Sequence, residues 1–161
     1  KNYIFVAAGG IVLSKTAGDK NEYPSAKKAT EELGLSQRVK LLGNLSRADM
    51  KILFNTADLY ISPNIKVPGS MEGFGINAIE GAGCKKVVLA SNLEGLKDAV
   101  QEGKNGFLLP PEDAEVWTKK IIELLSDDEY RKKFGEKARQ FVIDNYSWDI
   151  IAQKYLEVIN Y

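Results

Sequence analysis

The chain has 161 residues, with 22 basic and 22 acidic side chains, one cysteine and no histidine. The length fits one domain with a buried core, and the balanced charge argues against a general nucleic-acid binder. The absence of histidine excludes His-based triads, His metal sites and His general bases. With Cys84 alone, no intrachain disulfide is possible, and a reducing compartment is expected.

Five short apolar runs predict β-strands. They are rich in β-branched or aromatic residues and are bounded by Gly, Pro, Asn or Ser. Near-continuous hydrophobicity is typical of strands that are buried on both faces, as in a parallel sheet. The strands are predicted at residues 3–8, 39–42, 59–62, 87–90 and 106–109.

Helical patterns alternate with these strands. Gly34 is expected just past the end of the first helix, and Ser46 is expected to cap the second, with Asp49 completing a weak capping box. The alternation predicts an α/β fold, a Rossmann-like parallel sheet with helices on both faces. The helices are predicted at residues 23–34, 46–57, 75–83, 94–103, 111–127, 127–146 and 147–159.

Two kinds of targeting segment are not expected. No apolar run approaches the roughly 20 residues of a membrane helix. The first residues, KNYIFVAAGG, lack the basic region of a signal peptide and are interpreted as the end of a strand.

The stretch MEGFGINAIE, residues 71–80, contains a glycine turn with a carboxylate on either side. It follows a predicted strand, where open α/β sheets bind ligands. The amides of Phe74, Gly75 and Ile76 are expected to be unpaired donors at a helix N-terminus, which favours phosphate. Glu72 beside them can accept hydrogen bonds from sugar hydroxyls.

Glu80 lies eight residues after Glu72, at most about 12 Å along a helix axis. That distance is comparable to the span from one sugar across a diphosphate to the next. We therefore predict that Glu72 meets a donor sugar, that the amides meet a diphosphate, and that Glu80 meets a ribose diol. The alternative is that both acids are solvated charges at the helix ends, with Glu72 favoured by the helix dipole.

The same glycines leave two other functions open. GFGINA, residues 73–78, fits a dinucleotide fingerprint, with Glu94 as the ribose acid of an NAD-dependent oxidoreductase. That fingerprint should follow its strand directly, whereas about ten residues intervene here. A non-catalytic nucleotide-binding or assembly module is the third interpretation.

The chain resembles the retaining GT-B glycosyltransferases, the large group similar to glycosyltransferase family 4. Glu72, Gly73, Phe74, Gly75 and Glu80 match the E-x7-E signature of that family. The likeness continues in residues 32–64, 86–113 and 146–159, so it covers nearly the whole chain.

The resemblance implies the C-terminal, donor-binding domain of such an enzyme. Glu72 would contact the donor hexose near the reacting carbon and is the catalytic candidate, and Glu80 would bind the ribose. The glycine loop after the first strand and the main chain at Leu45 would border the nucleotide. The alternative for the glycine loop is a plain strand-to-helix turn, and Leu45 fits a core position as well as a contact with the base. The predicted donor-binding residues are Gly9, Gly10, Leu45, Gly73, Phe74, Gly75, Ile76 and Glu80.

The chain departs from the family at its start. Family domains usually begin with another strand and helix, which carry an Arg and a Lys that grip the diphosphate. The chain begins at the second unit, and neither cation can be mapped onto it; Lys15 and Lys20 are expected in a solvated loop. The resemblance further implies an N-terminal acceptor domain, which we expect outside this stretch of sequence. We expect the donor-binding half, inactive alone.

The reaction implied is the transfer of a glycosyl group from a UDP- or GDP-linked sugar to an acceptor hydroxyl, with retention of configuration. Stabilisation of the leaving diphosphate by positioned amides would carry most of the catalysis. Neither a cofactor nor a metal is expected. The acceptor would be a carbohydrate or glycolipid in polysaccharide, lipopolysaccharide or glycolipid synthesis. The expected location is the cytoplasm, with peripheral association at the inner membrane face.

Overall fold

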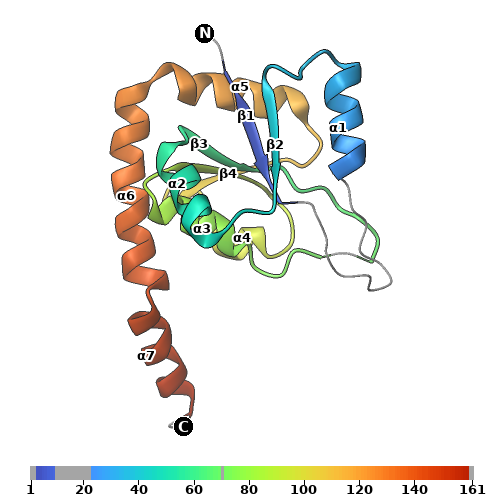
Figure 1. Ribbon diagram of the computed structural model, residues 1–161. Helices are drawn as coiled ribbons and strands as arrows, with labels where there is room; N and C mark the ends of the chain where they lie inside the picture. The colour runs from blue at the N-terminus through green and yellow to red at the C-terminus, as the bar shows by residue number, and fades with distance from the viewer. Residues whose placement is uncertain (1–2, 10–22, 70, 160–161) are drawn as a thin grey trace. The chain divides into compact units, whose positions relative to one another are not determined.

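The computed structural model describes residues 3–9, 23–69 and 71–159 (Figure 1). The chain forms two compact units, Lys1–Ile52 and Leu53–Tyr161. Each unit contains a parallel sheet, which confirms the predicted α/β class. All five predicted strands are present, and they are divided between the two sheets.

The first unit contains a two-stranded parallel sheet of β1 (Phe5–Ala8) and β2 (Val39–Gly43), and α1 (Tyr23–Glu32) packs against β2. Gly34 takes a positive φ of 66°, and the N–H of Leu35 returns to the carbonyl of Thr30 at 2.9 Å. This ends α1, because a left-handed residue after the last turn lets the chain satisfy the free carbonyls. The predicted helix end is confirmed.

Helix α2 (Arg47–Thr56) begins with the predicted cap. The Ser46 hydroxyl accepts from the N–H of Asp49 at 3.1 Å and donates to the Asp49 carboxylate at 2.6 Å. These bonds satisfy one of the free donors of the first turn.

The second unit is built on a parallel sheet ordered β3 (Leu59–Ser62), β4 (Val87–Ser91) and β5 (Gly106–Leu109). Every residue of the central strand β4 is buried. Successive side chains of a strand point to opposite faces. Both faces of this sheet are therefore covered, as the continuous apolar run VVLA predicted.

Helix α3 (Ile76–Gly83) packs against β3 and β4. Gly81 makes the close approach possible, because a Cβ built there would lie 3.1 Å from Cγ of Tyr60. The Tyr60 ring in turn packs against Phe54 of α2, with ring centroids 5.7 Å apart. Tyr60 is thereby fixed beside α3.

The predicted helix at residues 94–103 is wrong in extent, because α4 covers only Leu96–Ala99. Glu94 has a left-handed φ of 47°, so the helix begins after it. The buried Asn105 side chain accepts from the N–H of Gln101 at 2.7 Å and donates to the carbonyl of Ala99 at 2.8 Å. These side-chain bonds compete with helical bonds and turn the chain towards β5.

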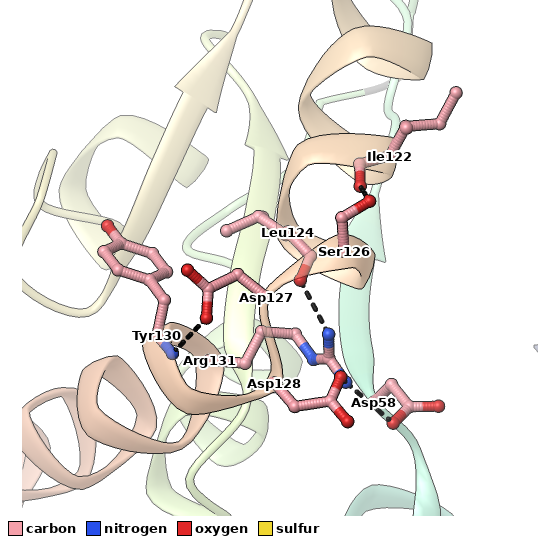
Figure 2. A network of polar contacts seen from close by, with 8 residues as sticks. All are labelled: Asp58, Ile122, Leu124, Ser126, Asp127, Asp128, Tyr130 and Arg131. Atoms are coloured by element: carbon pink, nitrogen blue, oxygen red, sulfur yellow. Dashed lines mark hydrogen bonds and ion pairs between the residues drawn. The ribbon is translucent and has the colours of Figure 1, made fainter.

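Helices α5 (Ala114–Ser126) and α6 (Asp128–Tyr146) meet at a corner organised by Arg131 (Figure 2). The Arg131 guanidinium donates to the carbonyl of Leu124 at 2.6 Å and to Asp128 at 2.7 Å, and it lies 3.4 Å from Asp58 before β3. Asp127 caps α6 by accepting from the N–H of Tyr130 at 2.8 Å. One largely buried cation thus joins the end of α5, the start of α6 and the residue before β3.

The chain closes with α7 (Trp148–Ile159), which follows α6 (Figure 1). It has no buried residue, and the Trp148 side chain is 87% exposed. Among the described residues, no helix has the length and apolar character needed to cross a membrane.

Candidate functional site

A pocket of about 380 Å³ lies at the carboxyl end of β3, within the second unit. One side is formed by β3 and the residues just after it, and the other by the glycine turn and the first turn of α3. This is the edge of an α/β sheet where ligands are expected. The lining residues are Tyr60, Ser62, Asn64, Glu72, Phe74, Gly75, Ile76 and Asn77.

The half-buried Glu72 carboxylate is held from two sides of this pocket. One oxygen accepts from the N–H of Gly75 at 3.1 Å, and the other accepts from the Asn64 amide at 3.4 Å. Asn64 accepts in turn from the Ser62 hydroxyl at 2.9 Å. A carboxylate offers about four acceptor positions. The two bonds therefore leave Glu72 able to accept from the hydroxyls of a ligand.

The unpaired amides differ by one residue from the prediction. The expectation that the Gly75 N–H is free is wrong, because that group donates to Glu72. Among residues 71–159, the N–H groups of Phe74, Ile76 and Asn77 have no protein acceptor, whereas the N–H of Ala78 donates to the Gly75 carbonyl at 2.9 Å. The donors that remain for an anion are those of residues 74, 76 and 77.

Gly75 shapes the turn through its backbone. Its φ of 75° is left-handed, and a Cβ there would lie 2.6 Å from Cδ2 of Leu96. The Phe74 ring packs edge-on against Tyr146 of α6 at 6.1 Å, and a Cβ built on the exposed Gly73 would meet no atom within 4 Å. The turn therefore requires glycine at position 75, both for its left-handed backbone and for the close approach of Leu96.

The turn after β4 is hydrogen-bonded to the start of the glycine turn, at Glu72. The Glu94 carboxylate accepts from the N–H of Glu72 at 2.7 Å, and the N–H of Gly95 donates to the Glu72 carbonyl at 3.2 Å. A Cβ on Gly95 would lie 2.0 Å from the Gly73 carbonyl oxygen. Sequence reasoning missed this role of Glu94; the glycine directly after it was a signal of close backbone approach, but not of the residue that is approached.

Two carboxylates act on the Tyr60 phenol that lines the pocket. Burial raises the pKa of Tyr60 above its ordinary 10.0, the Ser62 hydroxyl opposes the shift, and the charges of Glu72 and Glu80 add to the rise. Glu80 itself is exposed and is not part of the pocket wall. It follows Asn77 by three residues, so both lie on the same face of α3. Its ribose-binding role remains a prediction.

The other predicted donor-binding residues belong to the first unit. Gly9 follows β1 with a φ of 107°, and its N–H donates to the Gly43 carbonyl at 2.6 Å. Leu45 lies in the connection from β2 to α2 and is half-buried. Gly10, Lys15 and Lys20 lie outside the described residues. The nucleotide contacts of Gly9, Gly10 and Leu45 remain predictions.

A metal site was not expected, and the residues that the structure describes contain no group of three or more His, Cys, Asp or Glu side chains that could hold an ion. Cys84 is a free thiol, half-buried at the end of α3.

Comparison with known proteins places the chain in a family of transferases. The family described as glycosyl transferases group 1 matches residues 1–141. The chain therefore belongs to the glycosyl transferases group 1, and the predicted resemblance is confirmed.

Named glycosyltransferases are similar to this chain over most of its length. It is 30% identical over 149 residues to a D-inositol 3-phosphate glycosyltransferase of Corynebacterium urealyticum, which covers 92% of this chain and 34% of the relative. It is also 30% identical, over 88% of its length and 35% of the relative, to the N,N'-diacetylbacillosaminyl-diphospho-undecaprenol alpha-1,3-N-acetylgalactosaminyltransferase of Campylobacter jejuni. The chain thus spans about a third of the length of these relatives.

Solved structures confirm the fold. A glycosyltransferase from Rickettsia africae superposes with a TM-score of 0.83 at 29% identity, over 98% of this chain and 39% of that one. Anabaena Alr3699/HepE in complex with UDP superposes with a TM-score of 0.82 at 24% identity, over 98% and 41%. The second likeness is one of fold alone.

Proposed function

We propose that this chain is the donor-binding domain of a GT-B glycosyltransferase and that it binds a nucleotide-diphosphate sugar. The observation that carries the proposal is the pocket in which the Glu72 carboxylate lies beside the N–H groups of Phe74, Ile76 and Asn77, which have no acceptor among the residues that the structure describes. Donors at a helix N-terminus suit a diphosphate, and a carboxylate suits sugar hydroxyls. Family membership supports the same assignment.

Within the pocket, each part of the donor has a proposed partner. Glu72 contacts the hexose, the three amides contact the diphosphate, and Glu80 accepts from the ribose diol. In the longer enzyme the sugar passes to an acceptor hydroxyl with retention of configuration. The fixed amides then stabilise the charge that develops on the leaving diphosphate. We propose no cofactor for this reaction, in which the nucleotide sugar is a substrate.

The nucleotide is proposed to be UDP or GDP. Fold neighbours crystallised with UDP and with UDP-glucose make UDP-glucose the first probe to test. For the acceptor, the curated relatives include transferases named for D-inositol 3-phosphate and for a diphospho-undecaprenol-linked sugar. We propose a carbohydrate or glycolipid acceptor, in polysaccharide, lipopolysaccharide or glycolipid synthesis, reached at the cytoplasmic face of the membrane.

The oxidoreductase alternative needs the Glu94 carboxylate to bind a ribose. That carboxylate does not line the pocket, and it accepts from the N–H of Glu72 at 2.7 Å. A non-catalytic nucleotide-binding module differs from the proposal only in the absence of transfer.

Titrating UDP, UDP-glucose, GDP and NAD into the chain, with the melting temperature as readout, tests the proposal. We expect UDP or GDP to raise the melting temperature by mass action and NAD to leave it unchanged. Glu80→Gln should weaken UDP binding, whereas Glu72→Gln should weaken UDP-glucose more than UDP. Stabilisation by NAD alone would end the transferase proposal, and no stabilisation by any nucleotide would favour an assembly module.

A further inference from the structure

Glu94 occupies a backbone conformation that its own residue type disfavours. Its φ is 47°, and only two other non-glycine residues of the described ranges share a positive φ, Lys85 and Glu112. In the left-handed region, the Cβ of an L-residue crowds the following carbonyl oxygen, which glycine avoids. Strain of this kind persists where the surrounding structure imposes it, and it clusters at functional sites.

The side chain of Glu94 makes a contact that glycine could not supply. Its carboxylate accepts from the N–H of Glu72, 22 residues earlier in the chain, at 2.7 Å. A bond from an N–H to a carboxylate is shorter and stronger than a bond between neutral groups. The strained residue therefore holds the main chain of the pocket's central acid.

Gly95 completes this hold on the same residue. Its N–H donates to the carbonyl of Glu72 at 3.2 Å, so both main-chain polar groups of Glu72 are bonded to two successive residues. The Glu72 carboxylate then accepts from the N–H of Gly75 at 3.1 Å. A connected series of bonds runs from the turn after β4 to the turn that opens α3.

We propose that Glu94 is a positioning residue for the pocket, with a carboxylate that fixes the backbone of Glu72 and thereby the direction of the Glu72 side chain. The effect on donor affinity rests on the proposed function, whereas the hold on the Glu72 backbone does not. Glycine at position 94 would relieve the strain and release Glu72. Stability and binding are therefore expected to respond differently to one substitution.

The test compares Glu94→Gly and Glu94→Gln with Glu112→Gly. Glu112 is a matched control, an exposed glutamate with a φ of 60° far along the chain from the pocket loop. Gln keeps an acceptor oxygen at the same reach. Three quantities are measured: the denaturation midpoint, the hydrogen-exchange rate of the Glu72 amide, and the affinity for UDP-glucose.

In Glu94→Gly we expect the Glu72 amide to exchange about tenfold faster or more, because a charge-assisted bond is lost. UDP-glucose affinity should fall about tenfold, while the denaturation midpoint changes little, because relief of strain offsets the lost bond. Glu94→Gln should restore slow exchange and most of the affinity. Glu112→Gly should change neither exchange nor affinity.

The hold on Glu72 is overturned if its amide exchanges at the wild-type rate in Glu94→Gly, whatever the ligand result. If the wild type binds UDP-glucose and Glu94→Gly binds it with the same affinity, the positioning role is overturned. If the wild type binds no UDP-glucose, the proposed function fails while the exchange comparison still decides the contact. Should Glu94→Gly fail to fold, Glu94→Asn tolerates the left-handed backbone but is too short to reach, and it is expected to give the same fast exchange.

Discussion

At the scale of single residues, Glu72 joins the fold to the proposed chemistry. Its carboxylate closes the glycine turn on Gly75 and still has acceptor capacity towards the pocket. Its backbone is held in place by Glu94 and Gly95. The geometry of the pocket therefore depends on residues that do not line it.

Gly95→Ala is expected to destabilise the protein by about 1–3 kcal/mol or more, because inserted atoms in a packed site force the backbone to shift. The added Cβ would lie 2.0 Å from the Gly73 carbonyl oxygen. Urea denaturation measures the loss. Gly73→Ala is the control, since its Cβ meets open space, and it should change the free energy of unfolding by less than about 0.5 kcal/mol. Equal effects of the two substitutions would contradict the close approach.

Tyr60 gives a prediction for alkaline pH. Burial raises the pKa of its phenol in the folded state, so the folded protein holds this proton more tightly than the unfolded chain. The resulting stabilisation is fully present below pH 10.0 and is lost as the pH rises through the higher folded-state pKa. The free energy of unfolding should therefore fall less steeply above pH 10.0 in Tyr60→Phe than in the wild type. Parallel curves for the two proteins would show that the phenol is not shifted.

The E-x7-E spacing, the glycine turn and the sheet edge could be predicted from the sequence, because each is a local pattern. The pairing of Gly75 with Glu72 changed which amides remain free, and nothing in the residue types specified that bond in advance. The role of Glu94 could not be predicted, because it depends on two loops meeting across 22 residues. Contacts of that range are set by the tertiary fold.

At the scale of elements, helix boundaries follow side-chain bonds to the backbone or a glycine in the left-handed conformation. Ser46 and Gly34 mark the helix ends that the sequence predicted. The helix after β4 is shorter than predicted because the buried Asn105 bonds to the backbone of Ala99 and Gln101. An asparagine six residues beyond a helix gives no local signal of that competition, so the periodic pattern alone overestimates the helix.

The corner between α5 and α6 provides a stability test at this scale. Arg131→Met removes the donors to Leu124 and Asp128, and the side chain is only 12% exposed. We expect a loss of about 1–3 kcal/mol, because a helix-terminal carbonyl loses its charged partner. Lys133→Met is the control, since its ion pair with Glu129 is exposed, and it should cost less than about 0.5 kcal/mol. Thermal or chemical denaturation measures both losses. An Arg131→Met variant as stable as the control would show that the Arg131 contacts do not stabilise the corner between α5 and α6.

At the scale of the whole molecule, the chain has two α/β units and belongs to a transferase family. Composition alone excluded broad classes but named no substrate. The family was predicted from the E-x7-E motif and from the likeness of the surrounding sequence over nearly the whole chain. The comparisons confirmed this prediction. Neither the base, the sugar nor the acceptor can be predicted from the described residues, because those contacts depend on side chains whose ligand geometry no local pattern specifies.

The most direct measurement follows the backbone amide resonances of the chain during a titration with UDP, and with NAD as the comparison. We expect UDP to produce its largest shifts at the amides of Phe74, Ile76 and Asn77, and NAD to leave these resonances in place. Shifts that spare these three amides, or that NAD reproduces equally well, would contradict a diphosphate site at the start of α3.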